Sequence, residues 1–63
     1  MKMMQLRKKK GITQAELADR CATTQQTIAK IEKGLVDPKL STLNKIAEAL
    51  GCELGDLFFS KSE

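Results

Sequence analysis

The sequence predicts an all-α fold of five short helices in one small domain that spans residues 1–63. Glycine and proline residues interrupt the chain at intervals suited to short helices. No segment sustains the alternation of apolar and polar residues typical of a strand. Alanine, leucine, lysine, glutamate and glutamine dominate the intervening segments, and these residues favour helices. A chain of 63 residues with 41% hydrophobic residues has room for one small core.

The first two helices are expected at about residues 3–10 and 14–21. Gly11 provides a C-terminal stop for the first helix, because glycine readily adopts the left-handed conformation that follows many helices. Thr13 is suited to cap the second helix, and Glu16 lies three residues later, where its side chain can bond back to the cap. The spacing therefore predicts a capping box.

The third helix is expected at about residues 25–33. Thr24 precedes it as a second N-cap candidate, because its hydroxyl can accept a bond from an amide of the first turn. Gly34 ends the helix, and a loop over residues 35–39 follows.

The fourth and fifth helices fill the rest of the chain. Ser41 or a neighbour begins the fourth, and Gly51 ends it. Its apolar residues recur at the spacing of one helix face and are Leu43, Ile46, Ala47 and Leu50. A short fifth helix is expected at about residues 54–58.

The composition excludes several classes of function. The chain has no histidine, so it has no histidine general base, catalytic triad or histidine metal ligand. Cys21 and Cys52 are too few for a four-ligand zinc site. They either form one disulfide or stay reduced, and we interpret them as reduced thiols of a cytoplasmic protein. No apolar stretch approaches the ~20 residues of a membrane span. We expect no enzymatic activity, no cofactor, no metal and no membrane insertion.

The positive charge is concentrated at the start of the chain. Residues 1–15 hold five basic and no acidic side chains, whereas the rest of the chain holds six basic and eight acidic ones. The basic run 7–10 is suited to a phosphate backbone, to an anionic lipid surface, or to solubility alone.

Residues 14–33 have the pattern of two helices joined by a short turn. Helices that cross steeply need a small residue at their contact, and Ala18 fits that position. The surrounding apolar or partly apolar positions are Leu17, Cys21, Thr23, Ile28 and Ile31. Any compact helical corner has the same inner pattern. Only the outer face of the third helix can therefore distinguish a DNA-binding helix-turn-helix from a purely structural corner.

That outer face carries amides, a methyl group and ammonium groups without a carboxylate among them. On a helix that turns about 100° per residue, the side opposite Ile28 and Ile31 is formed by Gln26, Ala29, Lys30 and Lys33. Gln25 lies on the flank of the same face. A glutamine amide matches the major-groove edge of adenine, and a methyl group can contact thymine. The pattern therefore favours DNA recognition over a merely solvated face.

The chain resembles the Cro/phage-repressor class of helix-turn-helix domains, also called the XRE family, over about residues 3–58. The residues that carry the resemblance are Leu6-Arg7, Gly11 through Ala18, Thr24-Gln25-Gln26, Ile28, Ile31 through Gly34, Pro38, Leu43, Ile46-Ala47, Ala49-Leu50-Gly51 and Leu54–Leu57. The resemblance implies a compact five-helix lambda-repressor-like domain with its helix-turn-helix at about residues 14–33. It also implies a sequence-specific regulator of transcription that binds double-stranded DNA, most simply as a repressor.

The resemblance also assigns roles to individual residues. The implied base-reading residues are Gln25, Gln26, Lys30 and Ala29. The implied phosphate-contacting or positioning residues are Gln14, Thr24, Thr27, Lys33, Lys39 and Lys9. Arg7 and Glu32 match a structural ion pair that joins the first helix to the third.

Three positions depart from the family pattern. Ala22 occupies a turn position that is usually glycine, which implies either a left-handed alanine or a helical turn. Glu53 replaces a short cap residue and weakens the start of the fifth helix. Asp37 lies in a loop where basic residues often meet phosphates.

The same loop predicts a homodimer through the adjacent apolar residues Leu35 and Val36, with Phe59 and the neighbouring Phe58 as further candidates. For Phe58 we favour the alternative that its ring closes the aliphatic core. An alternative function is that of an antitoxin-type module, which binds a toxin-like protein and also represses its own operon.

Overall fold

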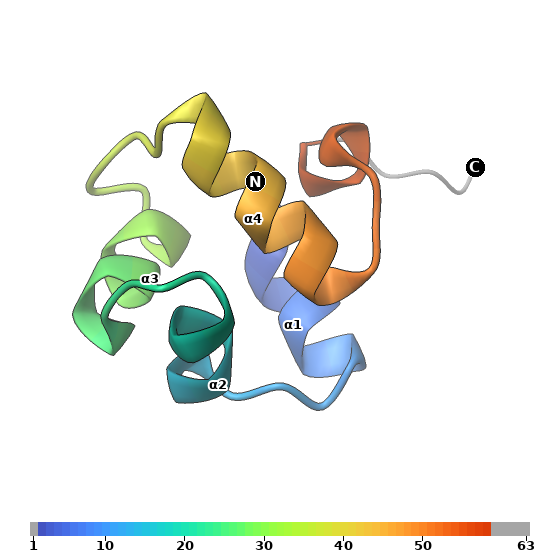
Figure 1. The fold of residues 1–63 in the computed structure, drawn as a ribbon, viewed down its shortest axis with the longest axis horizontal. Coiled ribbons are helices and arrows are strands. Elements are labelled where there is room, and N and C mark those ends of the chain that lie inside the picture. Colours follow the sequence, from blue (N-terminus) through green and yellow to red (C-terminus); the bar gives the residue numbers. More distant parts are fainter. Residues whose placement is uncertain (1, 59–63) are drawn as a thin grey trace.

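The computed structural model describes residues 2–58, which form four α-helices and one 3-10 helix (Figure 1). The elements are α1 (Met3–Lys9), α2 (Gln14–Arg20), α3 (Gln25–Glu32), α4 (Leu40–Leu50) and the 3-10 helix η1 (Leu54–Leu57). The described residues contain no strand, so the all-helical class is confirmed.

The expected short fifth helix is present as a 3-10 helix of four residues and not as an α-helix, so a count of five α-helices is not confirmed. Its bonds have the tighter i to i+3 spacing: Asp56 N–H donates to the Glu53 carbonyl, and Phe58 N–H donates to the Gly55 carbonyl. A segment this short, with a glycine inside it, cannot establish the ladder of i to i+4 bonds that an α-helix needs.

The helix starts follow the capping signals of the sequence. The Thr13 hydroxyl accepts from the Glu16 N–H at 3.0 Å, and the Glu16 carboxylate accepts from the Thr13 N–H at 2.9 Å. The predicted capping box is therefore present at the start of α2. Thr24 caps α3, with its hydroxyl 3.2 Å from the Thr27 amide nitrogen. α4 begins at Leu40, next to the expected Ser41, without a side-chain cap.

The turn between α2 and α3 contains an alanine in the left-handed conformation. Ala22 has φ +57°, where an L-residue meets a steric cost of roughly 1–2 kcal/mol. Backbone bonds hold the turn in place, including one of 2.9 Å from Thr23 N–H to the Ala18 carbonyl. Of the two alternatives for this departure, the structure shows the left-handed alanine.

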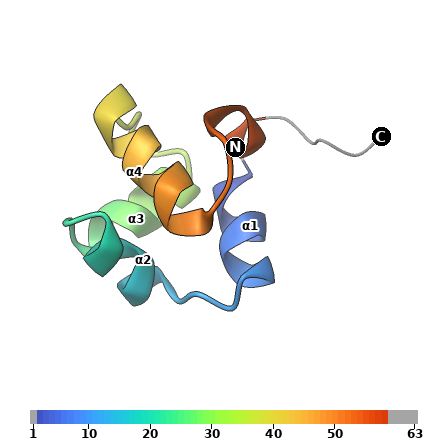
Figure 2. The ribbon, with the colours of Figure 1, turned by 45° about the vertical axis from the view of Figure 1, so that its right-hand side comes forward.

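The core is aliphatic and draws on every element. Its buried residues are Met3, Leu17, Ala18, Cys21, Ile28, Ile31, Ile46, Ala47, Leu50 and Leu57. Figures 1 and 2 show α2 and α3 side by side below α4, which also packs against η1. The Lys2 N–H donates to the Leu57 carbonyl and joins the start of α1 to η1. The small side chain of Ala18 is 3% exposed, as a close helix crossing requires.

Phe58 does not close this core. The residue is 45% exposed, whereas its neighbour Leu57 is fully buried. The interpretation of Phe58 as a core residue is therefore wrong. Phe59 lies outside the described residues.

Cys21 and Cys52 are free thiols, the first buried and the second half-buried. Burial raises the pKa of the Cys21 thiol, although the charge of Lys45 acts in the opposite direction. Burial and the nearby Asp56 carboxylate also raise the pKa of Cys52, against the charge of Lys10. Both groups therefore stay protonated near neutral pH and are poor nucleophiles.

Candidate nucleic-acid interface

The outward face of α3 is polar and exposed. Its exposed residues are Gln25, Gln26 and Lys30, with Lys33 directly after the helix, and Thr27 and Ala29 are half-buried. Ile28 and Ile31 are buried on the opposite side. Glu32 is the sole acidic residue of α3, and its side chain is only 3% exposed. The face therefore presents amides, one methyl group and ammonium groups to solvent, while the carboxylate is turned into the protein.

The first turn of α3 is fixed by two threonines. The hydroxyl oxygens of Thr24 and Thr27 lie 2.9 Å apart, in addition to the cap bond between the Thr24 hydroxyl and the Thr27 amide. These bonds hold the turn that carries Gln25 and Gln26. The glutamine amides themselves extend from a backbone that is already ordered.

Arg7 and Glu32 form an enclosed ion pair between the last turn of α1 and the end of α3. Arg7 Nε lies 2.7 Å from Glu32 Oε2, and Nη2 lies 3.3 Å from Oε1. The side chains are 9% and 3% exposed. Arg7 Nη1 also donates to the Ile12 carbonyl at 2.9 Å, so one guanidinium joins α1, the loop before α2, and α3. This arrangement leaves Arg7 inside the scaffold rather than on the outer face.

Gln14 is the third member of this network. Its Nε2 atom donates to Glu32 Oε1 at 2.9 Å. The sequence assigned Gln14 to a phosphate contact and identified no protein partner for its amide. No sequence signal pointed to this bond, although the carboxylate has room for it, since a carboxylate accepts several hydrogen bonds and a single arginine does not exhaust that capacity. The side chain remains half-buried, so part of it stays accessible to solvent.

The network keeps Glu32 ionised. Burial by itself raises the pKa of this carboxyl, but hydrogen bonds from Arg7 and Gln14 and the charges of Arg7 and Lys8 outweigh burial. The pKa of Glu32 therefore lies below its ordinary value. Among the described residues, no buried side-chain nitrogen or oxygen lacks a hydrogen-bond partner, so the network is fully satisfied.

The remaining basic candidates are exposed and come from separate parts of the chain. Lys33 adjoins the end of α3, whereas Lys9 ends α1 and Lys39 precedes α4. Asp37 is also exposed in the loop between α3 and α4. Of the three lysines, Lys33 is the one that directly follows α3 in the sequence.

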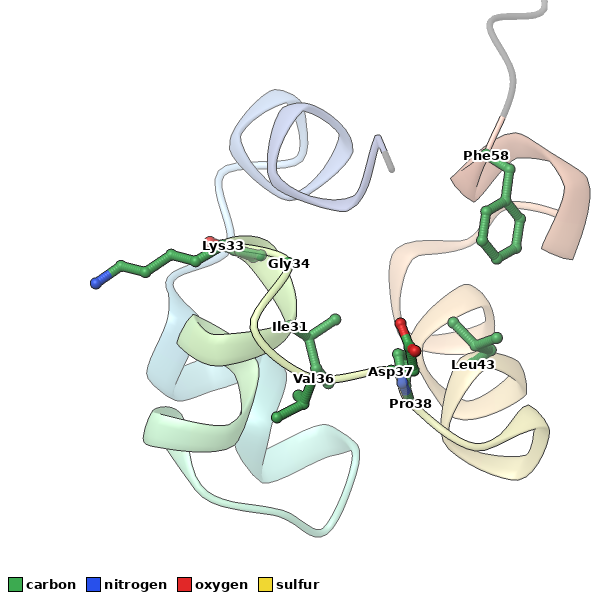
Figure 3. A pocket seen from close by; sticks show the side chains of 9 residues that line it. Ile31, Lys33, Gly34, Val36, Asp37, Pro38, Leu43 and Phe58 are labelled. Carbon is green, nitrogen blue, oxygen red and sulfur yellow. The ribbon is translucent and has the colours of Figure 1, made fainter.

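A pocket of about 550 Å³ opens at the C-terminal end of α3. Its lining residues are Ile31, Glu32, Lys33, Gly34, Val36, Asp37, Pro38, Leu43 and Phe58. In Figure 3 the Phe58 ring and Leu43 face the pocket from one side and Val36 lies on the other, whereas the Lys33 side chain extends away. Val36, which lines the pocket, is 42% exposed, and the preceding residue, Leu35, is 68% exposed. An apolar surface thus lies next to the polar face of α3.

Other kinds of site are not found in the part of the chain that the structure describes. Residues 2–58 contain no group of three or more cysteine, aspartate or glutamate side chains that could hold a metal ion. Within the same range, the helices are too short and too polar to cross a bilayer.

Comparisons with known proteins agree with this geometry. Residues 3–57 match a family described as helix-turn-helix. A protein of Methanothermobacter thermautotrophicus named as an uncharacterized HTH-type transcriptional regulator is 49% identical over 53 residues, which cover 82% of the chain and 77% of that protein. The HTH-type regulator YgzD of Bacillus subtilis is 36% identical over 62 residues, which cover 98% of the chain and 94% of YgzD.

A third relative has a different name. Antitoxin HigA1 of Mycobacterium tuberculosis is 42% identical over 52 residues, which cover 82% of the chain but 35% of the antitoxin. The similarity therefore concerns one part of a longer protein.

Proposed function

The chain belongs to the helix-turn-helix family of XRE-type transcriptional regulators, and on this basis we propose that it recognises a specific double-stranded DNA sequence by placing α3 in the major groove. One observation carries the proposal. The outward side of α3 is free of carboxylates because its one acidic residue, Glu32, is paired inside the protein. DNA phosphates repel carboxylates, so a face of this composition suits the groove.

Base recognition is assigned to the outer face of α3. The amides of Gln25 and Gln26 each offer a donor and an acceptor, which match N7 and N6–H₂ of adenine. The methyl group of Ala29 suits contact with thymine, and Lys30 suits a guanine edge or a phosphate one turn further along. Each good pair discriminates against a wrong base by about 1–3 kcal/mol.

Phosphate contact and helix positioning are assigned to residues around that face. They are Gln14, Thr24, Thr27, Lys33, Lys39 and Lys9. Phosphate contacts fix the position of the protein on the duplex and carry no sequence information. Those made by the three lysines also make the affinity depend on salt, because each phosphate that a cation neutralises releases counterions.

We assign the DNA-bound form to a homodimer whose contact includes Leu35 and Val36. One module of this size buries about 600–1,000 Å² on DNA, which limits specificity, whereas two half-sites about 34–36 Å apart double the contact. The exposed Phe58 ring extends the apolar surface beside this loop. Phe59 is assigned to the same contact from the sequence alone. Sedimentation on operator DNA tests the dimer, and a single bound copy at high concentration contradicts it.

The regulatory outcome assigned to the protein is repression in the cytoplasm, since a dimer seated on an operator excludes other proteins from the same DNA. The similarity to antitoxin HigA1 supports a second candidate. In that case the chain also binds a toxin-like protein and represses its own operon. Co-purification of a small partner together with operator binding distinguishes this candidate from a regulator that acts alone.

In vitro selection of DNA from a random duplex library tests the proposed function most directly. We expect an enriched site made of two related half-sites that are rich in A·T pairs. Binding of the enriched duplex should exceed that of a shuffled duplex of the same composition by at least about tenfold at the same salt concentration. Equal affinity for the two duplexes contradicts sequence-specific recognition.

A further inference from the structure

We propose that Glu32 is a positioning residue for DNA contact: from inside the protein, its carboxylate holds the Gln14 amide in the orientation in which that amide meets a phosphate. The inference rests on the proposed function, since it concerns the DNA-bound protein. It adds a role for a residue that does not itself touch DNA.

The chemistry of the two groups fixes which atoms face each other. An ionised carboxylate only accepts hydrogen bonds, so the nitrogen of the Gln14 amide, and not its oxygen, must face Glu32. The observed contact has this form, with Gln14 Nε2 2.9 Å from Glu32 Oε1. An amide nitrogen carries two hydrogens, and the bond to Glu32 engages one of them. The second hydrogen remains for an acceptor outside the protein.

Glu32 is itself held firmly. Arg7 binds both carboxylate oxygens, at 2.7 and 3.3 Å, and the Glu32 side chain is 3% exposed. The low pKa of the carboxyl means that it remains an acceptor throughout the neutral range. The anchor for Gln14 therefore has a fixed position and a fixed charge.

The backbone of Gln14 is fixed from the other end. Thr13 and Glu16 form the capping box that starts α2, and Arg7 Nη1 holds the Ile12 carbonyl at 2.9 Å. With its backbone held by the cap and its amide held by Glu32, the Gln14 side chain is ordered before DNA arrives. Ordering a flexible side chain on binding weakens affinity by about two- to tenfold, and an ordered donor avoids that loss.

A cycle of variants tests this role. Gln14→Ala removes the donor and leaves the Arg7–Glu32 pair in place. Arg7→Met combined with Glu32→Leu removes the anchor and leaves no unpaired buried charge, a replacement that folded domains often tolerate. Affinity for the selected duplex is measured over a range of salt concentrations for four proteins. These are the unaltered protein, Gln14→Ala, Arg7→Met/Glu32→Leu, and the variant with all three substitutions.

We expect Gln14→Ala to weaken binding by about three- to tenfold when Arg7 and Glu32 are intact. The salt slope should stay unchanged, because a neutral amide releases no counterion. In the Arg7→Met/Glu32→Leu background, the same change should weaken binding by less than about twofold. An equal effect of Gln14→Ala in both backgrounds overturns the positioning role, because a purely structural Glu32 acts independently of Gln14. Tighter binding without the anchor also overturns it, since Glu32 would then compete with the phosphate.

A measurement on the unaltered protein covers the case in which the doubly substituted variant fails to fold. We expect the side-chain amide hydrogens of Gln14 to shift in NMR spectra when the Glu32 carboxyl is titrated, while those of exposed Gln5 do not. A Gln14 amide that behaves like Gln5 overturns the inference. Absence of any selected DNA site defeats the proposed function itself, whereas a selected site with equal Gln14→Ala effects defeats this inference alone.

Discussion

The carboxylate of Glu32 at the end of α3 lies 2.7 Å from Arg7 Nε in the last turn of α1. The two residues are 25 positions apart in the sequence, and their contact joins α3 to α1. It also removes the one acidic group of α3 from the face proposed to meet DNA. A single buried pair thus contributes to the scaffold and to the electrostatics of the outer surface.

Removal of one partner of this pair should destabilise the fold strongly. We expect Arg7→Ala to lower the free energy of unfolding by about 3–5 kcal/mol, because it leaves the buried Glu32 carboxylate without its cation. Urea denaturation measures the change. Arg20→Ala is the matched control, since Arg20 is exposed and makes one long bond of 3.4 Å, and it should cost less than about 1 kcal/mol. An equal loss of unfolding free energy in the two variants would show that the ion pair stabilises the fold no more than the exposed Arg20 contact does.

Acid should weaken the fold through the same carboxyl. The pKa of Glu32 is below its ordinary value in the folded protein, whereas the unfolded chain regains a value of about 4.3. The stabilisation is therefore fully present above the unfolded pKa and is lost as the pH falls through the folded pKa. Unfolding free energies measured from pH 7 to pH 3 should fall more steeply for the unaltered protein than for Arg7→Met/Glu32→Leu. If the unfolding free energies of the two proteins fell equally steeply with pH, Glu32 would not be the source of the acid sensitivity.

Replacement of the left-handed alanine between α2 and α3 by glycine should stabilise the fold. Ala22→Gly is expected to raise the free energy of unfolding by about 1 kcal/mol, because glycine adopts φ +57° without the steric cost. Thermal or urea denaturation checks the gain. Ala15→Gly, at an exposed position inside α2, should instead lower it by about 1 kcal/mol. Destabilisation by both changes would show that Ala22 is not strained.

Loss of a proposed base contact should affect specific binding selectively. We expect Gln26→Ala to weaken binding to the selected duplex by about 1–3 kcal/mol and to leave random DNA nearly unchanged. Fluorescence anisotropy with both duplexes measures the difference. Gln5→Ala, which removes an exposed amide from α1, serves as the control and should change neither affinity. A uniform loss on both duplexes would refute the base-reading role of Gln26.

Loss of a proposed phosphate contact should show the opposite pattern. Lys9→Ala is expected to weaken specific and random DNA alike and to reduce the salt slope by about 1, because one fewer counterion is released. The exposed Lys45 of α4 provides a variant with the same change of charge, Lys45→Ala. Identical salt slopes for the two lysine variants would mean that Lys9 contributes only through net charge.

Local signals in the sequence were sufficient for the helices and most of their ends. Thr13 with Glu16 and the N-cap Thr24 predicted starts that the structure has at the same residues. Such features depend on bonds between residues three positions apart, so both partners can be recognised within one short stretch of the sequence. The outer face of α3 was also readable, because helical periodicity follows from spacing alone.

Two features of the candidate site depend on long-range packing and could not be predicted from local sequence patterns. The bond from Gln14 to Glu32 spans 18 positions, and no local pattern specifies that an amide on one helix reaches a carboxylate on another. Likewise, no local pattern specifies that Leu57 is fully buried while the neighbouring Phe58 is 45% exposed. Spacing therefore determines which helices form and which side chains share a face. Tertiary contacts determine which groups remain free, because burial and pairing depend on neighbours that are distant in the chain.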